Sequence, residues 1–367
     1  MYKKTKILNK HTFLLLAFIL LFINFLCLFA NEKAYASEKS NNYTSEIVME
    51  LNTKRILHQK NSKDKKYMAS TTKILTAIVI IENCDINEVV SITKDTIGIE
   101  GSSIYLEEGE KLTVKELLYG LMLRSGNDCA VTLAVHCSGS VDTFASLMNE
   151  TAKRVGANDS NFTNPHGLHD DNHYTTAYDL ALISCYAMKN EIFREIVGKK
   201  SVIIPHITRN YDRKLVNKNK ILFDFEGGNG IKTGFTKKAG RCLVSSCYRD
   251  GLELICVVLN CPPMFERSKE LLSNCFNNYK NYKIVESDNI LGFVKIKDSN
   301  EKCAICIKND IELPLTKSEY KNLKIIYNYD KIIEKPKENF VDNGFVEIYL
   351  ENNLIFKEKI YTILILK

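Results

Sequence analysis

The chain has 367 residues, of which 45% are hydrophobic, enough to bury one large core or two smaller ones. Its formal net charge of +6 falls to about +2 without residues 1–36, because that segment holds five Lys and one Glu. So small a charge argues against a nucleic-acid partner and against a strongly anionic one.

Residues 1–36 have the pattern of a signal peptide. A basic head at positions 3–10 precedes an apolar run at 13–30, and Ala-Tyr-Ala at 34–36 offers small residues for cleavage. An uncleaved membrane anchor is the alternative, since about 18 apolar residues just cross a bilayer. Both interpretations place the folded part outside the cytoplasm, secreted or attached to the outer face of the cell membrane and associated with the cell wall. Membrane contact is then expected only through an uncleaved leader.

The next 250 residues mix strands and helices. Thr113-Val-Lys-Glu116 is a capping box, and an apolar stripe follows it, so a helix is expected there. Asp250-Gly251 predicts a tight turn between two strands. In chain order we expect strands at 45–51 and 55–60, a helix from about 70, a helix at 176–187, strands at 230–235, 241–248 and 252–260, and a helix at 266–276.

After about residue 285 short alternating strands predominate and helical periodicity is absent. Strands are expected at 292–297, 302–308, 345–350 and 354–359, with turns at 342–344 and 352–353. The expected division is a signal peptide at 1–36, a mixed domain at 37–285 and a small all-β domain at 286–367.

Twelve cysteines are unusual for an exported chain, and one of them, Cys27, lies in the leader. The remaining eleven are scattered through apolar strands and helices, which favours small core side chains over a disulfide framework. Cys303-Ala-Ile-Cys306 has no second pair and no nearby His, so alternation in a strand is favoured over a metal or redox site.

One serine stands out as a candidate nucleophile. Ser-x-x-Lys alone selects nothing, because it occurs five times, beginning at Ser62, Ser70, Ser91, Ser299 and Ser318. Only the Ser70 copy lies between apolar residues, at the expected start of a buried helix. There the spacing places Ser70 and Lys73 on one face, within hydrogen-bond reach. Unpaired N–H groups at a helix N-terminus can stabilise an oxyanion.

Lys73 needs a lowered pKa to act as a base, because a lysine at about 10.4 is protonated at neutral pH. Burial and a second cation lower such a pKa, and Lys232 of the motif Lys232-Thr-Gly234 is the cation expected nearby. On an edge strand, Lys232 and Gly234 point one way and Thr233 the other. Gly234 then lets a substrate backbone lie close to the strand.

Ser125-Gly-Asn127 follows the capped helix as a loop. Ser125 can relay a proton to a leaving amine, and Asn127 can hold a substrate amide. Taken in isolation, the same three residues are equally compatible with an ordinary turn.

A cluster of histidines suggests a competing metal site. His166, His169 and His173 are spaced by three and four residues, as zinc ligands can be. Pro165 and Gly167 break any helix there, so a common face is not assured. A hydrogen-bonded loop beside the site is the favoured interpretation, with no metal and no cofactor.

With these residues placed, the chain closely resembles the low-molecular-mass penicillin-binding proteins, the serine D-alanyl-D-alanine carboxypeptidases. The resemblance covers residues 42–285 and, more weakly, the β domain; it is carried by 68–76, 123–128, 164–179 and 230–240. It implies an α+β fold: a β-lactamase/transpeptidase-like domain with an antiparallel sheet flanked by helices, then a small all-β C-terminal domain. It also accounts for the histidine loop without a metal.

By position, the resemblance implies catalytic roles for Ser70, Lys73 and Ser125 and substrate-binding roles for Asn127, Lys232, Thr233, Gly234 and Phe235. The N–H groups of Ser70 and Phe235 are expected to form the oxyanion hole. Family members often carry an arginine just after the last sheet strand that helps hold the substrate carboxylate. In this chain that loop, 260–267, is shortened, and whether Arg267 reaches the carboxylate stays open.

The resemblance implies removal of the terminal D-alanine from peptidoglycan pentapeptide stems through a Ser70 acyl-enzyme, with β-lactam antibiotics as inhibitors acylating the same serine. A D,D-endopeptidase or a β-lactamase on the same scaffold remains an alternative, as does a zinc peptidase. A non-catalytic cell-wall-binding protein is another, although the intact Ser70, Lys73 and Lys232 argue against it.

Overall fold

The computed structural model of the protein describes residues 44–206, 211–287 and 289–364. The expected signal peptide at 1–36 lies outside the described residues. Within the described ranges, a mixed α+β domain extends to helix α9 (Met264–Asn278), and a β-rich domain follows. None of the helices in these ranges has the length and apolar character needed to cross a membrane.

A five-stranded antiparallel sheet forms the centre of the first domain, with strand order β2-β1-β9-β8-β7. Its strands are β1 (Ser45–Glu50), β2 (Ile56–Lys60), β7 (Gly228–Thr236), β8 (Gly240–Arg249) and β9 (Leu252–Leu259). The predicted strands are therefore confirmed. Asp250 and Gly251 join β8 to β9 with φ of 49° and 78°, the pair of positive values that a tight hairpin turn demands.

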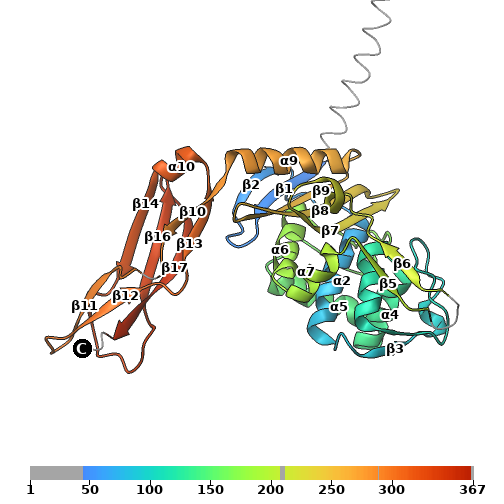
Figure 1. Cartoon of the computed structure of the whole chain (residues 1–367), viewed down its shortest axis with the longest axis horizontal. Helices are drawn as coiled ribbons and strands as arrows, with labels where there is room; N and C mark the ends of the chain where they lie inside the picture. The colour runs from blue at the N-terminus through green and yellow to red at the C-terminus, as the bar shows by residue number, and fades with distance from the viewer. Residues whose placement is uncertain (1–43, 207–210, 288, 365–367) are drawn as a thin grey trace, which may run out of the picture. The chain divides into compact units, whose positions relative to one another are not determined.

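Helices cover both faces of this sheet (Figure 1). The described helices of the domain are α2 (Lys73–Asn83), α3 (Val114–Tyr119), α4 (Asn127–Ser138), α5 (Val141–Arg154), α6 (Ala177–Met188), α7 (Glu191–Gly198), α8 (Ile221–Asp224) and α9. Helix α6 packs on β1 and β9 from one side, and α9 packs on β8 and β9. Two ribbons, β3 (Val89–Ser91) with β4 (Lys111–Thr113) and β5 (Ser201–Ile204) with β6 (Arg213–Val216), complete the domain.

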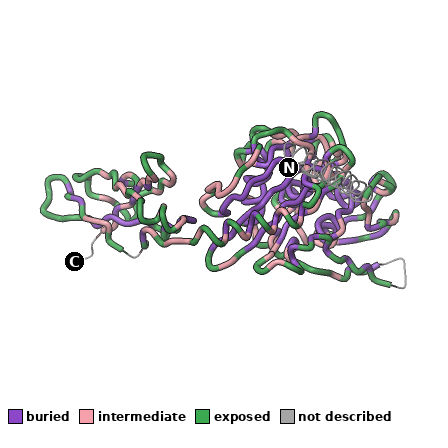
Figure 2. Tube along the Cα trace, turned by 90° about the horizontal axis from the view of Figure 1, so that it is seen from above, coloured by how far each residue is buried: buried purple, intermediate pink, exposed green. Residues whose placement is uncertain are grey.

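The sequence of strand β9 reflects burial on both faces of the sheet. Every residue from Leu252 to Leu259 is buried. Ile255 and Val257 belong to the larger core, whereas the alternate residues Leu254 and Cys256 belong to the core beneath α9. The nearly continuous apolar run of β9 is what a strand buried on both faces requires, and Figure 2 shows how burial concentrates in this domain.

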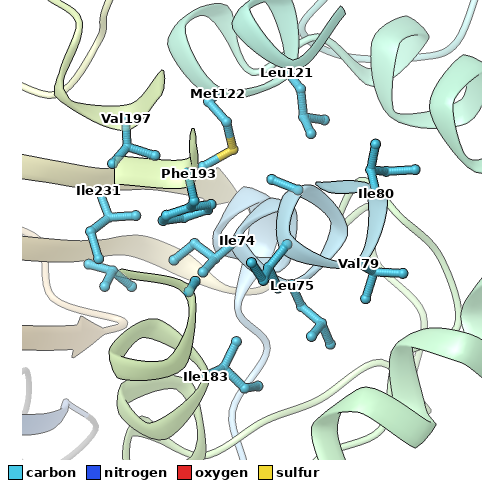
Figure 3. Packing of buried hydrophobic residues seen from close by; sticks show 14 of the residues in the cluster. Ile74, Leu75, Val79, Ile80, Leu121, Met122, Ile183, Phe193, Val197 and Ile231 are labelled. Carbon is cyan, nitrogen blue, oxygen red and sulfur yellow. The ribbon is translucent and has the colours of Figure 1, made fainter. Parts of the chain in front are cut away.

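Helix α2 runs through the larger core. All residues from Lys73 to Ile80 are buried, so the helix is enclosed on every side. In Figure 3, Ile74 and Leu75 of α2 lie among side chains from the turn after α3 and from α6 and α7. Burying one such side chain contributes roughly 1.5–3 kcal/mol. The start of α2 at Lys73, and with it the preceding turn that carries Ser70, is thereby held in a fixed place.

The capping box predicted at Thr113 is present. The Thr113 hydroxyl accepts from the N–H of Glu116, and the Glu116 carboxylate accepts from the N–H of Thr113 in return. Helix α3 starts there and continues into a π-turn, Gly120–Arg124, whose apolar residues are buried. Helix α6 is capped by the Thr176 side chain and matches the predicted helix.

The β-rich domain has its own core, which confirms a second domain dominated by strands. A six-stranded sheet has the order β14-β16-β17-β12-β11-β15, and β10 pairs with β13. The strands are β10 (Lys280–Val285), β11 (Gly292–Ile296), β12 (Lys302–Cys306), β13 (Ile311–Leu315), β14 (Leu323–Tyr329), β15 (Ile332–Ile333), β16 (Val341–Leu350) and β17 (Asn353–Leu364). One short capped helix, α10 (Lys317–Lys321), interrupts them.

Two details differ from the sequence prediction. The expected turn at 342–344 is wrong: these residues lie inside β16, where a bulge between Asp342 and Phe345 interrupts the pairing with β17. An Asp-Asn-Gly sequence supplies a bulge as readily as a turn, because Gly344 adopts φ of 118°. In addition, β10 precedes the expected boundary at 286 but pairs with β13 beyond it, so by strand pairing the β domain starts at Lys280.

The cysteines behave as core side chains. Nine of the eleven in the described residues are buried, and all eleven are free thiols. Cys303 and Cys306 both lie in β12, as the alternation argument predicted. Cys84 and Cys137 are half-buried at neighbouring helix ends, where their thiols share a hydrogen bond.

Candidate active site

Ser70 lies in a tight turn at the entrance to α2. The turn, Ala69–Thr72, is a 3₁₀ helix, and the α-helix itself begins at Lys73, three residues later than expected. Ala69 adopts φ of 48°, in the left-handed region that costs a non-glycine residue on the order of 1 kcal/mol. The packing of α2 sustains this strain and keeps Ser70 at the cleft.

Lys73 is wholly buried and contacts three oxygen atoms. Its Nζ lies 2.7 Å from Asn127 Oδ1, 2.7 Å from the carbonyl oxygen of His166 and 3.2 Å from Ser70 Oγ. The first two oxygens can only accept hydrogen bonds, whereas a serine hydroxyl can also donate. A neutral amine has two N–H donors and one lone pair, so the two acceptors direct that lone pair at Ser70.

The surroundings favour this neutral form of Lys73. Burial lowers the pKa of Lys73 well below its usual value of 10.5, and the positive charge of Lys232 lowers it further. Asp128 and Cys129 act in the opposite direction with smaller effect. A lysine placed in this way is able to accept the proton of Ser70 at neutral pH.

Lys232 lies on β7, which is the edge strand of the sheet. Its side chain is buried, and burial, with the nearby charge of Lys218, lowers the pKa of Lys232 to about 7. Along β7, Lys232 and Gly234 are buried, while Thr233 is half-buried and Phe235 is exposed. This is the alternation expected of a strand with one covered face.

Gly234 brings β7 against the Ser70 turn. A Cβ atom at this position would lie 3.0 Å from the carbonyl oxygen of Met68 and 3.1 Å from the backbone nitrogens of Ser70 and Thr71. Only glycine leaves this spacing undisturbed. The N–H of Ser70 and the strand that carries Phe235 are therefore close together, as an oxyanion hole requires.

Ser125 and Asn127 approach from the start of α4. Ser125 is buried and follows the π-turn with φ of 67°. Asn127 donates through Nδ2 to the carbonyl oxygen of Glu100, which leaves Oδ1 facing Lys73. Sequence reasoning missed Asp128, whose carboxylate accepts from Ser103 Oγ and from backbone N–H groups of the segment 104–106. That carboxylate anchors the loop bordering the cleft.

A cleft of about 300 Å³ brings the candidate residues together. Its lining residues are Ser70, Ser102, Ser125, Lys218, Thr233, Gly234, Phe235, Arg241, Met264 and Phe265. Five of the eight residues singled out from the sequence line it. Behind them, Lys73 contacts Ser70, and Asn127 contacts Lys73. Sequence reasoning missed Ser102, Lys218 and Arg241, because none of them belongs to a distinctive motif.

The histidine loop supports the Ser70 turn. The N–H of Thr163 donates to Nδ1 of His173, so Nε2 carries the ring proton and donates to Thr72 Oγ1 at 2.8 Å. Thr72 Oγ1 in turn donates to the carbonyl oxygen of Ala69. Gly167 permits the close approach: its φ is +85°, and a Cβ there would lie 1.9 Å from Ala69 O. Within the described ranges, no cluster of His, Cys, Asp and Glu has the arrangement of a metal site.

His166 and His173, the two more buried histidines of this loop, are neutral at pH 7. Burial lowers the pKa of His173 to about 4 and that of His166 to about 3, and the charge of Lys73 also lowers both. The carbonyl oxygen of His166 holds Lys73, a contact that no side-chain pattern in the sequence signals.

Arg267 does not reach the cleft. Its guanidinium donates two hydrogen bonds to the carboxylate of Glu46 on β1 and also pairs with Glu270. The shortened loop leaves Met264 and Phe265 at the cleft instead.

Comparison with known families gives two matches. Residues 32–262 match the model of a family described as D-alanyl-D-alanine carboxypeptidase. Residues 279–364 match the C-terminal domain of penicillin-binding protein 5.

Individual proteins with names of the same family are also similar to this chain. D-alanyl-D-alanine carboxypeptidase DacF of Bacillus subtilis is 33% identical over 276 residues, covering 72% of this chain and 70% of its own. DacD of Salmonella typhimurium is 28% identical over 335 residues, covering 86% and 84%. Among solved structures, penicillin-binding protein 5 of Haemophilus influenzae aligns with a TM-score of 0.76 at 27% identity, over 87% of this chain and 96% of that one.

Proposed function

Because the chain belongs to the D-alanyl-D-alanine carboxypeptidase family of serine peptidases, we propose that it removes the terminal D-alanine from peptidoglycan pentapeptide stems through an acyl-enzyme on Ser70. The observation that carries the proposal is the set of contacts around Lys73. Two carbonyl-type oxygens at 2.7 Å take its N–H bonds, and the remaining direction, at 3.2 Å, points to Ser70 Oγ.

Acylation begins with transfer of the Ser70 hydroxyl proton to the neutral amine of Lys73. The Ser70 oxygen attacks the carbonyl carbon of the scissile D-Ala–D-Ala bond, and the carbonyl electron pair moves onto its oxygen. The N–H groups of Ser70 and Phe235 are the proposed donors to that oxyanion. Their pre-set positions avoid reorganisation during the reaction.

Collapse of the tetrahedral intermediate breaks the C–N bond. Ser125, which lines the same cleft as Ser70, relays the proton from Lys73 to the leaving nitrogen, and free D-alanine departs. Lys73 is then neutral again. It accepts a proton from a water molecule whose oxygen attacks the ester, and Ser70 regains its hydrogen as the shortened peptide is released.

The substrate is expected to lie along β7. Thr233 and Gly234 line the cleft on the edge strand, where an extended peptide can add its backbone hydrogen bonds to the sheet. Lys232 contributes charge from behind the strand, and Asn127 fixes both Lys73 and the neighbouring substrate amide. A β-lactam presents its ring carbonyl to the same serine and is expected to acylate it.

We propose an extracytoplasmic location, where peptidoglycan stems are found. Residues 1–36 are the proposed signal peptide, and membrane contact is limited to this segment if it remains uncleaved. The mixed domain is the proposed catalytic unit. A test is the N-terminal sequence of the exported protein, for which Ser37 is the expected first residue.

Mass spectrometry with labelled penicillin tests the catalytic proposal. The label is expected on Ser70, and Ser70→Ala is expected to abolish both labelling and D-alanine release from a synthetic pentapeptide. Ser91→Ala is the matched control, because Ser91 begins an exposed copy of Ser-x-x-Lys. Label on another residue, or D-alanine release by Ser70→Ala, contradicts the proposal.

Two further assays distinguish a carboxypeptidase from a β-lactamase or an endopeptidase with the same fold. Rapid turnover of penicillin without D-alanine release indicates a β-lactamase. Cleavage of cross-linked stem dimers in preference to pentapeptide indicates an endopeptidase.

A further inference from the structure

The cleft requires a cation that the shortened loop does not supply. A peptide ending in D-alanine carries a carboxylate two bonds from the scissile nitrogen, and a carboxylate entering a half-enclosed cleft loses water unless it is paired. Arg267 is engaged with Glu46 and Glu270, and Met264 occupies the rim instead. The recognition of this carboxylate therefore rests on another residue.

Arg241 is placed for this role by the register of the sheet. It is near the start of β8, directly opposite Phe235 of β7, and it lines the same cleft as Ser70 and Thr233. Thr233 and Phe235 are two residues apart on one face of β7, a separation of roughly 7 Å. The Arg241 side chain is long enough to cover that distance.

The Arg241 side chain is exposed and its guanidinium lies over the Phe235 ring, 5.5 Å from the ring centroid. Stacking of this kind holds a guanidinium in place and leaves its N–H edge available. In the ranges that the structure describes, no carboxylate forms an ion pair with Arg241. Its charge is thus available to a ligand, unlike that of Arg267.

We propose that Arg241 binds the carboxylate of the terminal D-alanine and makes the enzyme selective for peptides with a free C-terminus. The inference rests on the proposed function, whose substrate it specifies further. The planar fork of the guanidinium matches a carboxylate with two parallel hydrogen bonds, which a single ammonium group cannot provide.

Lys218 is the rival cation in the cleft. Its Nζ donates to Ser102 Oγ at 3.2 Å, so part of its donor capacity is already used. Lys218 also offers a compact ammonium group in place of the planar fork of a guanidinium. Arg241, by contrast, is exposed and stacks on the Phe235 ring.

Two pairs of ligands test the proposal: a pentapeptide with a C-terminal carboxylate against the same peptide as an amide, and penicillin against its methyl ester. The wild-type protein is expected to prefer the carboxylate in both pairs. Arg241→Leu should lower kcat/KM and the acylation rate for the carboxylate forms by about 10- to 100-fold while leaving the neutral forms unchanged. Arg241→Lys should restore part of the loss.

Lys238→Leu is the matched control, because it removes the same charge from the same β7–β8 hairpin outside this cleft, and the preference should be unchanged. Equal losses on charged and neutral ligands, or a selective loss in Lys218→Gln in place of Arg241→Leu, overturn the assignment. If the wild-type protein acylates on Ser70 but Arg241→Leu keeps the preference, only this inference fails. If the wild-type protein is not acylated at all, the proposed function fails with it.

Discussion

The two domains place lysine side chains in opposite surroundings: buried beside the cleft in the catalytic domain and exposed at the surface in the β domain. In the β domain, Lys283, Lys335 and Lys359 lie at the surface and each pairs with a carboxylate, which raises its pKa. Behind the lining of the cleft, Lys73 and Lys232 are buried, and their pKa values are lowered.

What differs is the choice of neighbours. Carbonyl and amide oxygens surround Lys73, so its N–H bonds are satisfied without an anion that would stabilise the ammonium form. A surface lysine beside Asp342 is kept charged and inert as a base. Lys73 can therefore act as a base, because it is buried among neutral acceptors. Lys359 remains a surface cation, because it is exposed beside a carboxylate.

Removal of Lys73 is expected to have the largest effect. Lys73→Met keeps the buried volume but deletes the base, so acylation of Ser70 by penicillin should fall by roughly 10²–10⁴-fold. Lys359→Met, which removes a lysine from the surface of the β domain, should leave the rate unchanged. Stopped-flow acylation measures both, and comparable losses in the two variants would remove the distinction between the regions.

Lys232→Met should have the next largest effect, about 10- to 100-fold at pH 7. Without the charge of Lys232 the pKa of Lys73 rises, and a smaller fraction of the amine is neutral. The loss should shrink as pH increases, because Lys73 is then deprotonated by the solvent. A loss that is constant from pH 7 to pH 10 would mean that the charge of Lys232 does not control the pKa of Lys73.

Acid should destabilise the catalytic domain before it affects the β domain. In the unfolded chain a histidine takes up a proton near pH 6.5, whereas folded His173 resists protonation down to about pH 4. The unfolded state therefore binds more protons between these values, and stability falls as pH decreases through this window, by about 2 kcal/mol for His173 between pH 7 and pH 4.5.

Urea unfolding at the two pH values measures this loss. His173→Gln should have a flatter profile because the titrating ring is absent. An unchanged profile in the variant would place the pH dependence elsewhere.

Gly234→Ala should have the smallest effect, about tenfold on acylation. The new Cβ lies 3.0–3.1 Å from backbone atoms of the Ser70 turn, so the turn shifts by a few tenths of an ångström. The N–H of Ser70 moves with it. The thermal unfolding temperature should change little. If the variant instead loses stability but keeps its specific acylation rate, Gly234 has no role in placing the oxyanion donors.

The sequence predicted most of what rests on local pattern. Alternation along β7, the Thr113 capping box and the strand that became β9 each depend on residues that are neighbours in the chain. The same reasoning failed at 342–344, since Asp-Asn-Gly is compatible with both a turn and a bulge, and only the pairing with β17 decides between them.

The rest of the site depends on distant contacts. His166 acts through its backbone carbonyl, which leaves no side-chain signature, and Asp128 acts by holding a loop 22–25 residues earlier. Arg241 enters the cleft because Phe235 lies opposite it in the hairpin. Of these, Arg241 was accessible from the sequence in principle, by counting the register back from the turn at 237–239.

The protonation state of Lys73 tests the account most directly. The ¹³Cε shift of Lys73, assigned by comparison with Lys73→Met and followed from pH 5 to pH 11, reports its pKa alongside that of Lys359 in the same spectra. We predict that Lys73 is neutral at pH 7 while Lys359 titrates above 10.5. A Lys73 transition at or above 10.5 would contradict the mechanism, because the amine could not then accept the proton of Ser70.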